Sequence, residues 1–361
     1  MNRNRLITIM TCIMVIFASS CVKDNGEETP VDPVVPEQPE KPEVPEVPEV
    51  PEEPEKPDPE RYPEGITVSE EYFDHGNGKK TRYFVAKLDF KSNPDLKFNV
   101  LLNRPKKTPS KNYSEFDFKE EIPYIICNGG YFSATTSMSL VTIKGFCEVV
   151  APVSMSWPNM EHPKHTIYPV RAAFGQMKDG SFHIDWVFCC DPSARKHYSF
   201  PSPLDNDEKN EKFMAAPPTA DTPGAEEWNA VTAIGGGPML VQDSKDVAME
   251  NYWKECLDSG GTAGASHVPR TGIGLDKDGN PIVIVCDGRS MKGSYGLTLS
   301  ELARTFIQHG AVVAMNLDGG GSSALVGKGG ELLNWPSDSG SSANAIERKV
   351  VSSIAFSLEL K

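Results

Sequence analysis

Apolar runs typical of β-strands recur along this chain, and four of them end in the same way. Each breaks into one or more Gly, in three of the four accompanied by Asn or Asp. Glycine lets the backbone approach a ligand closely or adopt φ > 0, which a Cβ would resist. The repeated ending predicts one polar site where several strands finish. The four runs are residues 122–132, 231–241, 282–289 and 311–326.

Other segments carry the patterns of strands, hairpins and one helix. The helix at 299–309 is the clearest, because Thr298 and Glu301 match a capping box and the apolar residues after them keep to one face. Val and aromatic residues in partial alternation predict strands, and turn-forming residues between two runs predict hairpins. The predicted strands are residues 81–90, 96–103, 171–176, 181–188, 271–275, 281–286 and 350–360.

This order of elements predicts an α+β fold, a mixed and largely antiparallel β-sheet packed on helices. No G-x-G-x-x-G motif leads from a strand into a helix, so a doubly wound Rossmann fold is not expected. Residues 65–361 show no second Pro-rich break and are numerous enough for one large core. We therefore expect a single large domain over that range.

The first twenty residues have the pattern of a signal peptide. Arg3 and Arg5 precede an apolar stretch of about a dozen residues, which is too short for a comfortable membrane span. Small residues then lead directly into Cys21, as in a bacterial lipobox. The pattern predicts an exported protein of the bacterial cell envelope, lipidated and membrane-anchored at Cys21. Ordinary secretion with a free Cys21 is the alternative.

Residues 21–64 are predicted to be a spacer that follows the lipidated cysteine. Pro recurs every third residue from Pro30 to Pro57, with Glu between. Polyproline II has three residues per turn, so the prolines would stack along one edge of a semi-rigid, extended rod. A ligand for a proline-binding module is the alternative interpretation.

Charge and cysteine content narrow the choice of partner. The chain has a formal net charge of −14, and residues 22–64 hold fifteen acidic and four basic side chains. The remainder is only mildly acidic and has no basic stripe, so no nucleic-acid partner is expected.

No C-x-x-C or H-E-x-x-H motif occurs, and we predict neither a metal site nor a cofactor. Disulfide pairing and oligomeric state stay open.

Seven blocks between residues 125 and 355 resemble the phosphodiester glycosidase family. They are NGGYF at 128–132, GGGPML at 235–240, RTGIGLD at 270–276, VCDGR at 285–289, GLTLSELA at 296–303, NLDGGGSSA at 316–324 and ERKV at 347–350. The resemblance implies a hydrolase that cleaves the glycosidic C1–O bond of a sugar 1-phosphodiester, such as a GlcNAc 1-phosphodiester. Free sugar and a phosphomonoester would be released.

That chemistry assigns roles to the polar residues at the strand ends. Glycoside hydrolysis usually takes two carboxylates, and Asp318 and Asp287 are the predicted catalytic pair. Guanidinium groups match phosphate oxygens, and backbone N–H groups of a glycine turn can form an anion-binding nest. The predicted substrate-binding residues are Asn128, Gly129, Gly130, Arg270, Arg289, Asn316, Gly320, Gly321, Ser322, Ser323 and Arg348.

Plainer interpretations stay open for each of these residues. Asp287 and Asp318 precede glycines and could simply form turns, and the arginines could form surface ion pairs. Two other functions also remain possible for the whole site. One is a surface lipoprotein that binds carbohydrate without turnover. The other is a phosphodiesterase that cuts the P–O bond instead.

Overall fold

The computed structural model describes residues 58, 60–157, 165–258, 263–339 and 344–361. They belong to one compact unit, Pro54–Lys361. The predicted signal peptide, the lipidated Cys21 and nearly all of the Pro-rich spacer lie outside the described residues, so those predictions stay predictions. No helix in the described ranges is long and apolar enough to cross a membrane.

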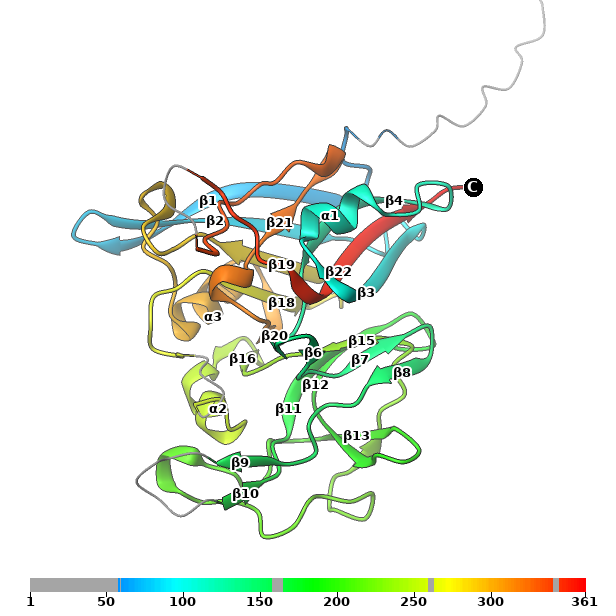
Figure 1. Ribbon diagram of the computed structural model, residues 1–361, viewed down its shortest axis with the longest axis vertical. Coiled ribbons are helices and arrows are strands. Elements are labelled where there is room, and N and C mark those ends of the chain that lie inside the picture. The colour runs from blue at the N-terminus through cyan, green and yellow to red at the C-terminus, as the bar shows by residue number, and fades with distance from the viewer. Residues whose placement is uncertain (1–57, 59, 158–164, 259–262, 340–343) are drawn as a thin grey trace, which may run out of the picture. The chain divides into compact units, whose positions relative to one another are not determined.

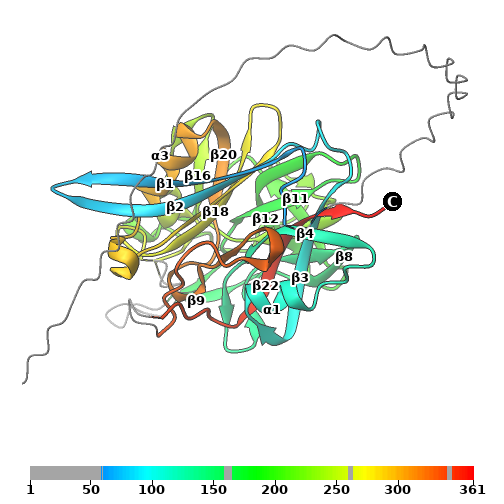
Figure 2. The same cartoon turned by 90° about the horizontal axis from the view of Figure 1, so that it is seen from above.

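A seven-stranded antiparallel sheet contains the predicted hairpin of residues 271–286 as β18 and β19. The strand order is β1-β2-β19-β18-β20-β16-β17, and the long β1–β2 hairpin forms one edge (Figure 2). Strand β18 lies antiparallel between β19 and β20, so the polar endings of those two strands lie at the same end of the sheet, on either side of β18. The bounds are β1 (Ile66–Gly76), β2 (Lys79–Leu88), β16 (Met239–Gln242), β17 (Lys245–Asp246), β18 (Arg270–Asp276), β19 (Pro281–Cys286) and β20 (Ala311–Asn316).

A second seven-stranded sheet is also antiparallel and has the order β14-β13-β12-β11-β15-β7-β8. Several of its strands are only two to four residues long. Its bounds are β7 (Val141–Ile143), β8 (Phe146–Val149), β11 (Arg171–Gln176), β12 (Phe182–Asp191), β13 (Lys196–Phe200), β14 (Glu226–Glu227) and β15 (Thr232–Gly235).

A four-stranded antiparallel sheet has the order β21-β4-β22-β3, with the C-terminal β22 between β4 and β3 (Figure 1). Two small hairpins, β5–β6 and β9–β10, complete the described strands. The bounds are β3 (Leu96–Lys107), β4 (Glu121–Asn128), β5 (Phe132–Ser133), β6 (Thr136–Ser137), β9 (Met155–Trp157), β10 (His165–Ile167), β21 (Leu325–Val326) and β22 (Val350–Glu359).

Helices are few and short in the described ranges. Helix α3 begins after Thr298 with the predicted capping box and buries Leu302 and Phe306 beside the central sheet. The described helices are α1 (Pro109–Ser114), α2 (Ala248–Lys254) and α3 (Leu299–Gln308), with single 3₁₀ turns at Glu208–Asn210, Met291–Gly293, Gly320–Ser322 and Lys328–Gly330.

The largest core lies between sheets and not between a sheet and helices. Phe98 of β3 packs edge-on against Phe174 of β11, with ring centroids 5.0 Å apart, and Phe174 stacks on Phe182 of β12 at 5.4 Å. Apolar residues of all three large sheets belong to this cluster. The predicted α+β class, a sheet packed on helices, was therefore wrong. The fold is mostly antiparallel β, because the sheets bury one another's apolar faces.

Candidate functional site

A cavity of about 300 Å³ lies where strand ends of the sheets meet. Its charged lining consists of four guanidinium groups and a single acid, counted over the described residues. Asn316 and two aromatic side chains contribute further polar and flat surfaces. These residues are Arg171, Arg270, Arg289, Arg348, Asp318, Asn316, Tyr131 and Phe132. An excess of fixed positive charge in a confined space favours an anionic ligand.

Asp318, two residues after the end of β20, supplies the acid. Its Oδ1 accepts a hydrogen bond from the amide of Gly319 at 2.9 Å. Burial raises the pKa of its carboxyl to about 6, although hydrogen bonds from Ser322 and Gly319 and the guanidinium of Arg348 act in the opposite direction. A carboxyl with this pKa is largely ionised at neutral pH and can still take up a proton in weak acid.

Asn128 at the end of β4 is buried and positions the Asp318 segment without lining the cavity. Its Nδ2 donates to the backbone oxygen of Asp318 at 2.7 Å, and its Oδ1 accepts from the hydroxyl of Thr271 at 2.8 Å. The amide of Asp318 in turn donates to the backbone oxygen of Gly129 at 3.1 Å. Two of the predicted strand endings are thus joined by hydrogen bonds.

The two glycines after Asn128 allow close backbone packing. A Cβ on Gly129 would lie 2.6 Å from the hydroxyl of Ser352, and one on Gly130 would lie 2.3 Å from the backbone oxygen of Gly235. No side chain fits at either position without displacing a neighbouring strand. Their geometry supports a role in assembling the sheets, and neither lines the cavity.

Arg270 at the start of β18 lines the cavity and is almost fully buried. Its Nε donates to the backbone oxygen of Leu297, and its Nη2 donates to the backbone oxygens of Ala263 and Ser266, all at 3.0 Å. These backbone acceptors hold the guanidinium in place at the cavity wall.

Arg289 and Arg348 reach the glycine turn after Asp318 from two other segments. Arg348 pairs with Asp338 at 2.8 Å and donates to the hydroxyl of Ser322 at 3.3 Å. Arg289 adopts φ 56° and donates from Nη1 to the backbone oxygen of Ser337 at 3.4 Å. A Cβ on Gly321 would lie 2.5 Å from Nη2 of Arg348, so glycine makes room for this guanidinium.

Two of the three amides of the predicted anion nest, those of Gly320 and Ser322, already donate to backbone oxygens. The amide of Gly320, a residue at φ 61°, donates to the backbone oxygen of Pro269 at 2.7 Å. The amide of Ser322 donates to the backbone oxygen of Gly319 at 3.1 Å. Ser322 and Ser323 are buried, and their side chains do not line the cavity. Gly320 and Gly321 do line it, and the arginines supply its cationic groups.

Asn316, a predicted substrate-binding residue two positions before Asp318, lines the cavity. Its Nδ2 donates to the hydroxyl of Tyr131 at 2.7 Å and to the backbone oxygen of Gly237 at 3.2 Å. Its Oδ1 is buried without a hydrogen-bond partner in the described structure. An unpaired buried acceptor costs free energy, and a ligand hydroxyl or amide N–H could satisfy it.

Asp287 lies apart from the residues that line the cavity. It is fully buried, where its Oδ2 accepts from Nε of Arg82 at 2.8 Å and its Oδ1 from the amide of Trp335 at 2.5 Å. Burial raises the pKa of its carboxyl against the effect of these partners. The contacts support a structural role that ties β2 to the segment at Asn334 and Trp335.

Sequence reasoning missed Arg171 and its neighbour Glu255. Arg171 of β11 lines the cavity and donates to the backbone oxygens of Glu255 at 3.0 Å and Cys256 at 2.6 Å. The carboxylate of Glu255 accepts from the amides of Ala172 and Met239, which belong to the two different seven-stranded sheets. No motif surrounds either residue, so only the folded chain brings them to the site.

Residues 196–357 match the family described as Phosphodiester glycosidase. The SPbeta prophage-derived uncharacterized protein YomE of Bacillus subtilis (strain 168) is 35% identical over 122 residues, 34% of this chain and 16% of that protein. The mouse N-acetylglucosamine-1-phosphodiester alpha-N-acetylglucosaminidase is 33% identical over 113 residues, 30% of this chain and 21% of the enzyme. The matches thus span about a fifth or less of these relatives.

Solved structures extend the likeness to most of the fold. The catalytic domain of the zebrafish N-acetylglucosamine-1-phosphodiester alpha-N-acetylglucosaminidase, auto-inhibited by its pro-peptide, has a TM-score of 0.54 at 16% identity, covering 83% of this chain and 86% of that one. A hypothetical protein from Synechocystis has a TM-score of 0.50 at 16% identity, covering 82% and 62%. At such identity the likeness concerns the fold alone.

Proposed function

We propose that this chain, whose residues 196–357 match the phosphodiester glycosidase family, hydrolyses the glycosidic C1–O bond of a sugar 1-phosphodiester. The products would be the free sugar and a phosphomonoester. The name of the mouse relative supports an N-acetylglucosamine-like sugar. The observation that carries the proposal is the convergence of four arginines and one carboxylate on a single cavity.

The arginines suit the phosphate half of the substrate. As the C1–O bond breaks, its electron pair leaves with the phosphate oxygen, and the phosphate gains negative charge. Guanidinium groups already held by backbone carbonyls need little reorganisation to stabilise that charge. A phosphate is a good leaving group, so a strong general acid matters less here than in the hydrolysis of an alkyl glycoside.

Asp318 suits the sugar half. Positive charge develops at C1 in the transition state, and a carboxylate at the wall of the cavity stabilises it. Asp318 would act at C1 directly or accept a proton from the attacking water, whose oxygen becomes the new hydroxyl of the sugar. A pKa of about 6 keeps the group ionised for either task at neutral pH.

Asp287 takes a supporting role in this proposal. Its carboxylate is held by Arg82 and by the amide of Trp335, and its side chain contacts Asn334. Asn334 donates from Nδ2 to the backbone oxygen of Ser323 and accepts from the amide of Leu325. Asp287 would therefore steady the segment that follows the glycine turn.

Product analysis with a defined substrate tests the proposal. Purified protein is incubated with GlcNAc-α-1-phospho-methyl mannoside beside the Asp318→Ala variant, and the products are resolved by mass spectrometry. The expected products are free GlcNAc and a mannoside phosphate, with a rate roughly 10³-fold or more lower in the variant. Asp278→Asn, an exposed turn residue, is the control and should keep full activity.

Two other results would replace the proposal. Formation of GlcNAc 1-phosphate would mean cleavage of the P–O bond. Binding of the diester without turnover, across a panel of sugars, would mean a carbohydrate-binding protein.

A further inference from the structure

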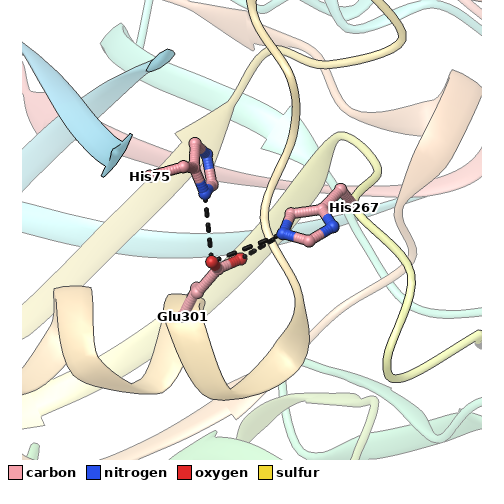
Figure 3. Close-up of side chains that lie close together, drawn as sticks. All are labelled: His75, His267 and Glu301. Carbon is pink, nitrogen blue, oxygen red and sulfur yellow. Dashed lines mark hydrogen bonds and ion pairs between the residues drawn. The ribbon is translucent and has the colours of Figure 1, made fainter. Parts of the chain in front are cut away.

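Two histidines and a glutamate meet at a second cluster that the proposed function does not use (Figure 3). His75 comes from the end of β1, His267 from the segment before β18, and Glu301 from the first turn of α3. Nδ1 of His75 lies 3.0 Å from Oε1 of Glu301, and Nε2 of His267 lies 3.1 Å from Oε2. These three segments are distant in sequence and are joined only by the fold.

We propose that His75, His267 and Glu301 bind a divalent transition-metal ion, of which Zn²⁺ is the best fit. Two imidazoles and one carboxylate form a ligand set that such ions prefer, with a further position open to water. The proposal is independent of the sugar phosphodiester chemistry, because none of the three side chains lines the arginine-rich cavity.

The ligand atoms lie close enough together to share one ion. One nitrogen from each histidine and one oxygen of Glu301 all lie within 4.8 Å of one another. Ligand atoms about 2.1 Å from a tetrahedral ion are separated by roughly 3.4 Å. The nitrogens of His75 and His267 lie 3.0 and 3.4 Å from the same carboxylate oxygen, Oε1 of Glu301, which is close to that separation. The two nitrogens lie within 4.8 Å of each other, so an ion would draw the two rings together.

The hydrogen bonds of His75 favour a metal at its Nδ1. Its Nε2 lies 2.8 Å from the hydroxyl oxygen of Thr81, which also accepts from the amide of Gly296 and lies 3.0 Å from the backbone oxygen of that glycine. If Nε2 carries the proton, it donates to Thr81, and the Thr81 hydroxyl donates to Gly296. The Nδ1 lone pair of a neutral ring is then left for an ion, and metal-binding histidines generally donate their other N–H in this way.

The other two ligands are also oriented in advance. Oε2 of Glu301 accepts from the amide of Thr298 in the capping box at 2.8 Å, which holds the carboxylate at the start of the helix. The ring of His267 packs against Tyr295 with centroids 4.3 Å apart. The side chain of His267 is 29% exposed, so water and ions can reach the cluster.

An ion at this cluster would connect three elements, one of which contributes to the cavity wall. Val268 and Arg270 line the cavity and lie one and three residues after His267. Arg270 also donates to the backbone oxygen of Ser266, the residue before His267. Metal binding would stabilise the β1–β2 hairpin, the start of α3 and the segment that carries Arg270 as one unit.

Metal titration of chelator-treated protein tests the inference. Zn²⁺ binding is followed by calorimetry, and Co²⁺ binding by visible absorption. We expect one equivalent of each ion, a Co²⁺ spectrum without thiolate charge-transfer bands, and a Tm at least ~3 °C higher at saturating Zn²⁺. The absence of thiolate bands separates this cluster from the chain's cysteines.

Variants connect the binding to these residues. Glu301→Gln keeps an oxygen for the capping box and should weaken Zn²⁺ binding at least tenfold, as should His267→Ala. Thr81→Val keeps all three ligands and removes only the partner of His75, with an expected loss of 10–100-fold. His183→Ala removes an exposed histidine elsewhere and should bind normally. No Zn²⁺ binding by the unmutated protein, or equal binding by Glu301→Gln and His267→Ala, would overturn the inference.

Discussion

Single side chains decide the chemistry of this protein, and sequence motifs predict the position of some of them but not of others. Asp318, Asn316 and three of the four arginines stand in recognisable motifs, and the fold brings them to one cavity. Asp287 stands in an equally strong motif, yet it is buried against Arg82. The patterns Asp-Gly at 287 and at 318 are locally alike, so only the packing distinguishes a cavity residue from a structural one.

At Asp318 we expect function and stability to oppose each other. Asp318→Asn should lose activity roughly 10³-fold or more and yet raise Tm at pH 7.5, because it removes a charge that the fold disfavours. The folded pKa of about 6 lies above the ordinary value of 3.8, so the stability gap should be absent below about pH 3.8 and complete above about pH 6. Thermal melts at several pH values check this.

The activity of the unmutated protein should depend on pH through the ionisation of the Asp318 carboxyl. We expect kcat/KM to rise as pH increases through about 6, since Asp318 must be ionised to act. The pH profile with a sugar phosphodiester measures it. A rate that stays constant from pH 5 to pH 8 would exclude Asp318 as the ionising group.

Glu255 should be important for stability although no motif marks it. Burial raises the pKa of its carboxyl to about 7, against hydrogen bonds from Met239, Ala172 and Trp186. Both of its oxygens accept from N–H donors, so the amide nitrogen of Glu255→Gln would face a donor. We expect a loss of about 2–4 kcal/mol in urea unfolding. The exposed Glu250→Gln is the matched control and should cost under about 0.5 kcal/mol.

At the level of elements, helix α3 and the predicted hairpins were easier to predict than the order of strands in the sheets. Helix α3, its capping box and its buried face were all anticipated, because each depends on residues three or four apart. Strands such as β15, with four residues, show too little alternation to be placed in a sheet by pattern alone. The second seven-stranded sheet was therefore only partly anticipated.

The capping box offers a test at this level. Thr298→Ala removes the side-chain acceptor for the amide of Glu301 and should destabilise the protein by about 0.5–2 kcal/mol. Thr135→Ala, at an exposed turn, should change stability far less. Chemical denaturation of both variants gives the comparison. Equal stability of Thr298→Ala and the unmutated protein would mean that packing alone sets the start of α3.

At the level of the whole molecule, the N-terminal segment remains a prediction. Residues 1–57 lie outside the described structure, and the lipobox pattern at Cys21 still predicts export and lipidation. We expect the mature protein to partition into detergent and to carry a lipid mass at its N-terminus. Cys21→Ser should lose both properties, whereas Cys12→Ser, inside the predicted signal peptide, should keep them. Mass spectrometry of membrane fractions measures the modification, and an unmodified Cys21 would contradict the predicted lipid anchor.

The sequence by itself determined what short-range interactions control. Caps, tight turns and polar strand endings depend on neighbours a few residues away, and the order of seven blocks predicted the family whose model residues 196–357 match. Tertiary structure decided what long-range packing controls. The apolar faces of the strands are similar in composition, so which faces meet depends on the whole chain, and the sheets covered one another where helices were expected. The same packing separated Asp287 from the cavity, added Arg171 to it and joined His75 to Glu301 across 226 residues.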